Sequence, residues 1–199
     1  MLKVSCNDEG IEKASQIIKR GGIIVYPTDT VYGIGCNPYN IEAVKKIYEI
    51  KSRNISKSVP VLTYSLETAE KIVYLDKFSR KIAKKFWPGP LTLILKVTDE
   101  KIKQSLNLEN KIAIRVPNHK CTLELLKKCD FLVGTSANIS GNQSSTDPEK
   151  CIRELYDYDI FVDGGIIHSK GESTIVEIDN SEVKIIREGS LNKEEILQT

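Results

Sequence analysis

Helical and strand-like patterns alternate along almost the whole chain. Apolar residues recur at helical spacing over residues 11–18, Gly21-Gly22 can end such a helix, and the short apolar run 23–26 is typical of a buried strand. Asn40 is the expected N-cap of the next helix. Its expected inward stripe consists of Ile41, Val44, Ile47 and Tyr48.

The later elements continue this alternation. Ser65, Asp76 and Asp147 are expected to cap three further helices, the last with Pro148 in its first turn, and residues 121–129 are expected to form a fourth. Strands are expected at 59–64, 91–97, 111–116, 131–134, 174–178 and 183–187, with a turn at Asp179-Asn180. The pattern predicts an α/β fold with a mixed, twisted sheet flanked by helices.

Length and composition indicate one ordinary globular domain. The 199 residues contain no linker-like stretch, so a single domain over residues 1–199 is expected. No apolar run approaches the roughly 20 residues that cross a bilayer, and Asp8 and Glu9 precede any secretory h-region. We therefore expect a cytoplasmic protein without a membrane partner. The formal net charge of +2 neither requires nor excludes RNA.

The five cysteines suggest neither a metal site nor a redox motif. Their number is odd and no two form a Cys-x-x-Cys pair. We expect them to be reduced, and no resident metal is predicted from them.

Two polar loops follow apolar strands and are candidate ligand sites. The segment 27–35 (PTDTVYGIG) offers the hydroxyls of Thr28 and Thr30, and its glycines could let a ligand approach the backbone. The segment 135–141 (TSANISG) follows a second strand. A tight turn and a polar connector without ligand are the competing interpretations. The length of the second loop favours function.

Several cations are candidates for anion binding. Lys51, Arg53 and Lys57 lie beyond the end of a helix, where they could bind a triphosphate or merely stabilise the helix dipole. Strand periodicity places Arg115 opposite Ile112 and Ile114, beside the small Ala113. Arg187 is expected on the face of Val183 and Ile185, where a charge needs a partner unless it reaches water.

Absent motifs narrow the chemistry. The sequence contains no HExxH, GxSxG, Walker A or complete GxGxxG pattern. Metal-dependent hydrolysis and serine acylation are therefore not indicated, and any nucleotide must be bound by another arrangement.

The order of motifs resembles the YrdC/Sua5 family from about residue 21 to 191. The blocks are PTDTVYGIG, KSR, WPGPLTLIL, AIRVP, TSANISG, GESTIVEI and IIREGSL. The combination of Lys-x-Arg and Ser-x-Asn within these blocks is far more specific than either pair alone. The resemblance implies a YrdC-like twisted open mixed sheet and the short, single-domain form of the family.

The resemblance also implies an activity. It is that of a nucleotidyltransferase that converts L-threonine, bicarbonate or CO2, and ATP with Mg2+ into threonylcarbamoyl-AMP and pyrophosphate, the first step of tRNA threonylcarbamoyladenosine synthesis. The implied threonine contacts are Thr30, Arg115, Ser136 and Ser173. The implied ATP contacts are Lys51, Arg53, Lys57, Asn138, Ser144, Ser145 and Arg187, with Lys51 and Arg53 the catalytic pair. Their substitution by Ala is expected to reduce turnover far more than folding. The implied acceptor of the product is the tRNA threonylcarbamoyltransferase machinery.

The chain departs from the family pattern at named positions. Asn54 stands where proline often follows Lys-x-Arg, Ser58-Val59 stands for a Pro-Leu pair, and Leu62 aligns with a substrate-side histidine of some relatives. Two other functions stay open at this point. One is a non-catalytic module for tRNA or double-stranded RNA that uses a basic helix (Lys77, Arg80, Lys81, Lys84, Lys85), and the other is a relative that acts on carbamoyl phosphate.

Overall fold

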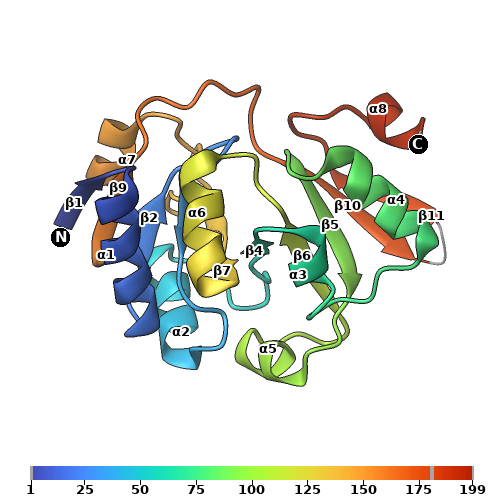
Figure 1. The fold of residues 1–199 in the computed structure, drawn as a ribbon, viewed down its shortest axis with the longest axis horizontal. Coiled ribbons are helices and arrows are strands. Elements are labelled where there is room, and N and C mark those ends of the chain that lie inside the picture. Colours follow the sequence, from blue (N-terminus) through green and yellow to red (C-terminus); the bar gives the residue numbers. More distant parts are fainter. Residues whose placement is uncertain (1, 180–181, 199) are drawn as a thin grey trace.

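The computed structural model describes residues 2–179 and 182–198 as a mixed α/β fold (Figure 1). The helices are α1 (Asp8–Lys19), α2 (Ile41–Ile50), α3 (Leu66–Ala69), α4 (Lys77–Phe86), α5 (Glu100–Ser105), α6 (Lys120–Cys129), α7 (Pro148–Glu154) and α8 (Lys193–Leu197). The strands are β1 (Leu2–Ser5), β2 (Ile24–Tyr26), β3 (Gly33–Gly35), β4 (Val61–Thr63), β5 (Leu91–Lys96), β6 (Lys111–Arg115), β7 (Phe131–Val133), β8 (Thr135–Ser136), β9 (Ile160–Asp163), β10 (Thr174–Asp179) and β11 (Glu182–Arg187).

The strands form two mixed sheets where the sequence led us to expect one. The five-stranded sheet has the order β1-β9-β2-β3-β8, and the six-stranded sheet has the order β11-β10-β5-β6-β4-β7. A backbone hydrogen bond joins the sheets, since Val133 N, at the end of β7, donates to Cys36 O, just after β3, at 2.9 Å. The predicted class, a twisted mixed sheet flanked by helices, is confirmed.

Local signals determine where the helices begin. The side chains of Asn40, Ser65 and Asp76 each accept a hydrogen bond from a backbone N–H in the first turn of the following helix. Asp147 does the same for α7, whose first residue is Pro148. These predicted caps are confirmed. Asn180, part of the predicted turn between the last two strands, lies outside the described residues.

The core extends between the sheets and the helices that cover them. Helix α1 packs against α6 and β9, and α6 also contacts β4 and β7. Val44, Ile47 and Tyr48 of α2 are buried as predicted, but Ile41 is 48% exposed, so its place in the inward stripe was wrong. Ile41 is the first residue of the helix, so its side chain, which leans toward the N-terminus, has no preceding turn to pack on.

One long segment connects the two sheets. Residues 164–173 run from the end of β9 to the start of β10, which lie in different sheets (Figure 1). Ser169 Oγ donates to the backbone oxygen of Thr30 and so ties the segment to the loop before β3. The connection brings Glu172 and Ser173 to the place where the two sheets meet.

The expectation that every cysteine is reduced is wrong for one pair in this structure. Cys6 and Cys121 form a disulfide, with their Cα atoms 5.8 Å apart. The packing of α1 against α6 brings together two segments 115 residues apart, which no local spacing reveals. Cys36, Cys129 and Cys151 are free, and burial raises the pKa of each thiol.

No helix within the described part of the chain combines the length and the apolar character needed to cross a bilayer.

Candidate functional site

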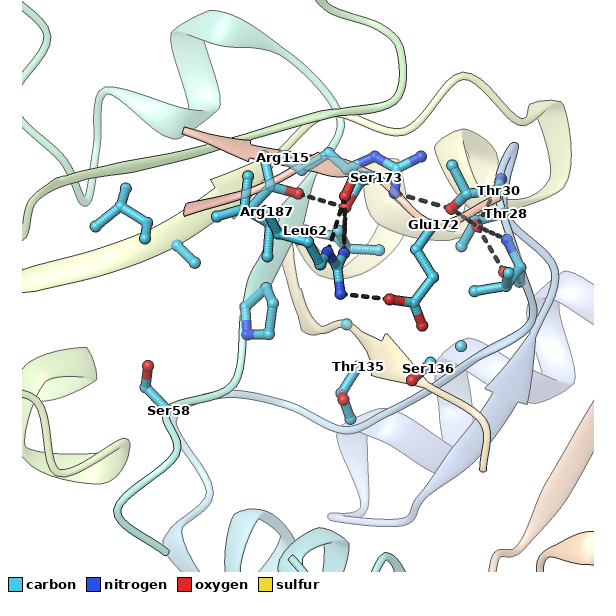
Figure 2. A pocket seen from close by; sticks show the side chains of 18 of the residues that line it. Thr28, Thr30, Ser58, Leu62, Arg115, Thr135, Ser136, Glu172, Ser173 and Arg187 are labelled. Carbon is cyan, nitrogen blue, oxygen red and sulfur yellow. Dashed lines mark hydrogen bonds and ion pairs between the residues drawn. The ribbon is translucent and has the colours of Figure 1, made fainter. Parts of the chain in front are cut away.

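A cavity of about 220 Å³ opens where the two sheets meet (Figure 2). Its wall contains hydroxyl groups, guanidinium groups and an apolar floor that includes Leu62 and Ala113. The predicted site residues in this wall are Thr30, Arg53, Arg115, Ser136, Ser173 and Arg187. The predicted site residues outside it are Lys51, Lys57, Asn138, Ser144 and Ser145.

The two polar loops that the sequence marks as candidate ligand sites are neighbours in the structure. Strand β3 pairs with β8 in antiparallel fashion, and Gly33 lies opposite Ser136. The hydroxyl of Thr28 accepts hydrogen bonds from the backbone of Thr30 and Val31, at 3.1 and 3.2 Å, which is the role of a turn residue. Thr30 is left to face the cavity and Arg115.

Gly35 does not serve ligand approach as the sequence suggested. A Cβ atom there would collide with the backbone oxygen of Val133 in the neighbouring sheet. The residue therefore permits close contact between β3 and β7. Gly33 does line the cavity, where a Cβ would press on the ring of Tyr26 at 3.2 Å.

Arg115 is buried and uses all three of its nitrogen atoms. Its Nε donates to Gly89 O at 2.9 Å, Nη1 to Thr30 Oγ1 at 3.0 Å, and Nη2 to Asp29 Oδ1 at 2.5 Å. Burial lowers the pKa of this guanidinium, while the Asp29 carboxylate acts in the opposite direction. The group remains a cation. Its unused N–H groups provide a fixed place for a carboxylate.

Arg187 also faces the cavity, contrary to the expected strand face. Ile185 lies opposite Val176 but Arg187 lies opposite Ile175, so a β-bulge places Ile186 as an extra residue in β11. The bulge reverses the alternation of faces. Ile185 consequently packs on the core, whereas Arg187 lines the cavity together with Ile175.

The partner that Arg187 needs is present. Arg187 Nη1 forms an ion pair with Glu172, and Nη2 donates to the backbone oxygen of Ser173 at 2.8 Å and to its hydroxyl at 3.3 Å. The Ser173 hydroxyl also lies 2.9 Å from Thr92 Oγ1. Ser173 and Arg187, assigned to different ligands on the sequence, are therefore direct neighbours (Figure 2).

Lys51 lies beneath the cavity wall. Its side chain is buried, and its ammonium group donates to the backbone oxygens of Ser136 and Asn138, the latter at 2.7 Å. The backbone oxygen of Lys51 in turn accepts from Ser140 N at 2.8 Å. Burial is the largest cause that lowers the pKa of Lys51 to about 8, with a further contribution from Arg53.

Arg53 closes the loop that follows α2. Its Nε donates to Lys57 O at 3.0 Å, and Nη2 donates to Ser58 O at 2.9 Å. Lys57 is exposed, and its backbone oxygen also accepts from the hydroxyl of Tyr48. Arg53 lines the cavity, while Lys57 does not.

The segment after β8 is held by its own polar groups. Asn138 Nδ2 donates to Ile139 O at 3.0 Å and to Asn142 O at 2.8 Å, which identifies the other amide atom as oxygen. That Oδ1 atom is buried and has no protein partner. Just before α7, Ser145 Oγ accepts from Asp147 N at 3.1 Å, and Ser144 is half-buried beside it.

Comparison with known proteins decides the family. The family model named Sua5_yciO_yrdC and described as "Telomere recombination" matches residues 16–189. The chain belongs to the Sua5/YciO/YrdC family. A relative from Methanocaldococcus jannaschii, named putative threonylcarbamoyl-AMP synthase, is 35% identical over 188 residues, which cover 92% of this chain and 89% of that protein.

Longer members of the Sua5/YciO/YrdC family are also similar to this chain. The threonylcarbamoyl-AMP synthase of Bacillus subtilis is 34% identical over 200 residues, covering 98% of this chain but 57% of that protein. A crystal structure of Pyrococcus abyssi Sua5 complexed with L-threonine superposes with a TM-score of 0.89 at 31% identity, covering 99% of this chain and 59% of that one. The chain thus spans little more than half the length of these two relatives.

Sequence reasoning in terms of Sua5/YciO/YrdC motifs missed three wall or near-wall residues. Asp29 was quoted only as part of a motif, although it pairs with the buried Arg115. Glu172 preceded the assigned Ser173 without a role of its own. Leu62 was known only as a departure from the family pattern, and it forms apolar cavity wall. A buried arginine without a visible counter-charge was the signal that could have directed attention to Asp29.

Proposed function

We propose that the chain is a threonylcarbamoyl-AMP synthase, a nucleotidyltransferase that forms the adenylate from L-threonine, bicarbonate or CO2, and ATP. The observation that carries this proposal is the cavity between the sheets, where Arg53, Arg115 and Arg187 meet hydroxyl groups from several strands and loops. The substrates of this reaction carry several negative charges, and guanidinium and hydroxyl groups are suited to bind them. Two relatives described above are named for this activity.

In this proposal Arg115 binds the threonine carboxylate. Its free N–H groups are oriented by Thr30 and Asp29, and the hydroxyls of Ser136 and Ser173 complete the amino-acid subsite. Arg53 and Arg187 receive the phosphate oxygens, with Arg187 next to the amino-acid subsite through its contact with Ser173. The remaining nucleotide-side residues are Lys51, Lys57, Asn138, Ser144 and Ser145. Of these, Lys51, Asn138 and Ser145 act through the hydrogen bonds by which they hold the surrounding loops.

The proposed chemistry needs no protein nucleophile. The threonine nitrogen captures CO2 as a carbamate, whose oxygen attacks the α-phosphorus of ATP in line and expels pyrophosphate. Holding the two reactants in one cavity can contribute about 7–11 kcal/mol toward lowering the barrier. Cationic groups at the phosphate side stabilise the charge that develops on the leaving group.

Mg2+ is proposed to enter with ATP as part of that substrate. The unpartnered, buried Oδ1 atom of Asn138 fits this role, since Mg2+ prefers oxygen ligands and keeps few protein contacts when bound to phosphates. The ion would supply charge neutralisation on the phosphates. Asn138 would hold that side of the site through its two amide hydrogen bonds to backbone oxygens.

We further propose a cytoplasmic location and delivery of the product to the tRNA threonylcarbamoyltransferase machinery. Both follow from the unstable adenylate product, which requires an acceptor nearby. Co-purification of that transferase with this protein, compared with a variant lacking turnover, tests the partnership.

The RNA-binding alternative rests on α4, and its surface chemistry favours an ordinary solvated helix. Ile82 is fully buried on one face, while Arg80 on the other forms an ion pair with Glu70. Lys85 lies over the ring of Phe86 at 5.2 Å. Cations that already have protein partners contribute less to a phosphate-binding surface.

Pyrophosphate release from ATP tests the proposal. The assay contains bicarbonate and compares threonine with serine, glycine and no amino acid, in wild type and in Arg53→Ala. Release that depends on threonine and is lost in the variant supports the synthase. Release with carbamoyl phosphate in place of threonine would favour the carbamoyl-phosphate alternative, and RNA affinity with steep salt dependence but no release would favour the RNA-binding module.

A further inference from the structure

Glu172 is the carboxylate-bearing residue among the described residues that line the cavity. It shares that wall with Arg53, Arg115 and Arg187, so its surroundings are strongly cationic. In Figure 2 its side chain extends into the space between Arg187 and the β8 residues Thr135 and Ser136. A carboxylate in such surroundings suggests that the ligand carries a cationic group for it to bind.

The backbone around Glu172 is fixed. Its carbonyl oxygen accepts from Ser190 N at 2.8 Å and from Ser190 Oγ at 3.1 Å. Gly171, with a φ of +135°, turns the chain into β10, and Gly189 lies so close that a Cβ atom there would collide with the Glu172 oxygen. The carboxylate therefore starts from a rigid position, while its own side chain is 32% exposed and can exchange partners.

Two kinds of charge must be matched in the proposed reaction. The carboxylate of threonine and the phosphates of ATP are anions, for which the three arginines suffice. The ammonium group of threonine needs an acceptor, and its nitrogen must lose a proton before it can attack CO2. We propose, on the basis of the proposed function, that Glu172 binds this ammonium group and accepts that proton.

Asp29 is the competing carboxylate, and its contacts exclude it from this role. Its Oδ1 atom receives Arg115 Nη2 at 2.5 Å, its side chain is 14% exposed, and it does not line the cavity. Removing it from Arg115 would leave a buried cation without a partner. Glu172 can release Arg187 at lower cost, since the Arg187 side chain is 41% exposed.

The step balances without any further reagent. One N–H bond of the ammonium breaks, its electron pair stays on nitrogen, and the proton passes to a carboxylate oxygen of Glu172. The nitrogen pair then forms the N–C bond to CO2, and a C–O π pair moves onto oxygen. The second N–H proton is lost to water, and Glu172 later returns its own proton to solvent. Starting from bicarbonate, its hydroxyl group takes a proton from solvent and leaves as water, which gives CO2 before the N–C bond forms.

A binding experiment tests the first half of the proposal. Titration calorimetry compares threonine with 2,3-dihydroxybutyrate, in which a hydroxyl replaces the ammonium group. Glu172→Gln still offers Arg187 an oxygen acceptor, and we expect it to lose about tenfold in threonine affinity, typical of one charge-assisted contact, but little for the analogue. Glu172→Asp, which retains the charge, should restore part of the preference. Equal losses for both ligands would overturn the assignment.

A kinetic experiment tests the proton transfer. At saturating ATP and threonine, Glu172→Gln should form the adenylate slowly at pH 7 and recover about tenfold per pH unit toward pH 9, as solution base deprotonates the amine. The other charged or titratable side chains near Glu172 in space or in sequence are Arg187 on β11, Arg115 on β6, Lys51 and Arg53 after α2, His168 and Lys170 on its own segment, and Glu188. Loss of charge on Lys51 above pH 8 would lower activity, which is the opposite direction.

Two controls separate the possible failures. Conversion of threonylcarbamoyl-AMP and pyrophosphate back to ATP needs no base in its adenylyl step, so Glu172→Gln should retain it. A wild-type protein without threonine-dependent pyrophosphate release overturns the proposed function, and the proton-transfer role with it. An active wild type whose Glu172→Gln variant keeps its rate at pH 7 overturns the role of Glu172 alone.

Discussion

The ammonium group of Lys51 donates to the backbone oxygen of Asn138 at 2.7 Å, and thereby joins the end of α2 to the segment after β8. The same group also donates to Ser136 O. The Lys-x-Arg and Ser-x-Asn motifs, 85 and 87 residues apart at these contacts, are thus parts of one structural unit. The lysine of the first motif thus fixes the backbone position of the second.

The buried position of Lys51 changes what its removal should do. Lys51→Ala leaves two backbone oxygens without their donor, so we expect it to lower the free energy of unfolding by about 2–4 kcal/mol besides reducing turnover. Arg53→Ala is the matched variant, because Arg53 donates to partly exposed loop carbonyls. We expect it to change stability by less than about 1 kcal/mol while impairing ATP turnover. Urea unfolding and pyrophosphate release measure both quantities. Equal stability of the two variants would contradict the proposal that the hydrogen bonds of Lys51 to the segment after β8 stabilise the fold.

The pKa of Lys51 predicts a pH dependence. Burial lowers this pKa to about 8 from 10.5, so the charged form is disfavoured in the folded protein. Its cost to stability is present below pH 8 and is relieved as the pH rises from about 8 to 10.5, where the unfolded chain still binds the proton. Activity should change in the opposite sense. We expect kcat/KM for ATP, which reports the free enzyme, to fall above pH 8.

Lys51→Arg is the control for this profile, because a guanidinium does not titrate in that range. The descending limb near pH 8 should disappear in the variant, even if its maximal rate is lower. A limb that persists unchanged would assign the titration to another group.

Asp29 is predicted to be essential for keeping Arg115 usable. Asp29→Ala leaves a buried guanidinium without its counter-charge, and breaking such a pair typically costs about 3–5 kcal/mol. We expect a marked decrease in the free energy of unfolding and a higher KM for threonine. Lys111→Ala provides the comparison, since its ion pairs with Glu177 and Asp179 are more exposed and should contribute about 1 kcal/mol or less. A similar effect of both substitutions would mean that water solvates Arg115.

The sequence determined those features whose causes are local. The caps at Asn40, Ser65 and Asp76 were predictable because the side chain bonds to the backbone only a few residues away. Strand alternation correctly placed Arg115 beside Ala113 at the cavity. The same rule misplaced Arg187, because a bulge depends on how two strands pair and leaves no mark in the alternation itself.

Features that depend on contacts between distant segments could not be predicted from local sequence patterns. The Cys6–Cys121 pair arises from the contact of α1 with α6, and the split into two sheets depends on which strand ends meet. The roles of Asp29 and Glu172 as ion-pair partners likewise could not be predicted, because they depend on where the fold places Arg115 and Arg187. Charged residues are common on surfaces, so a lone acidic residue in a sequence carries little information about a site.

Gly134 and Leu62 offer a test of how the apolar side of the cavity limits the substrate. A Cβ atom on Gly134 would collide with Leu62, lying 2.8 and 2.9 Å from its two methyl carbons. Leu62 is 3% exposed and lines the cavity, so Gly134→Ala should force its side chain into the space proposed for the ligand. We expect a loss of about 1–3 kcal/mol in stability and a higher KM for threonine. Combining it with Leu62→Ala removes the collision, and the double variant should bind threonine better than Gly134→Ala alone. A purely additive loss in the double variant would show that the two side chains do not compete for this space, because contacting residues are expected to couple.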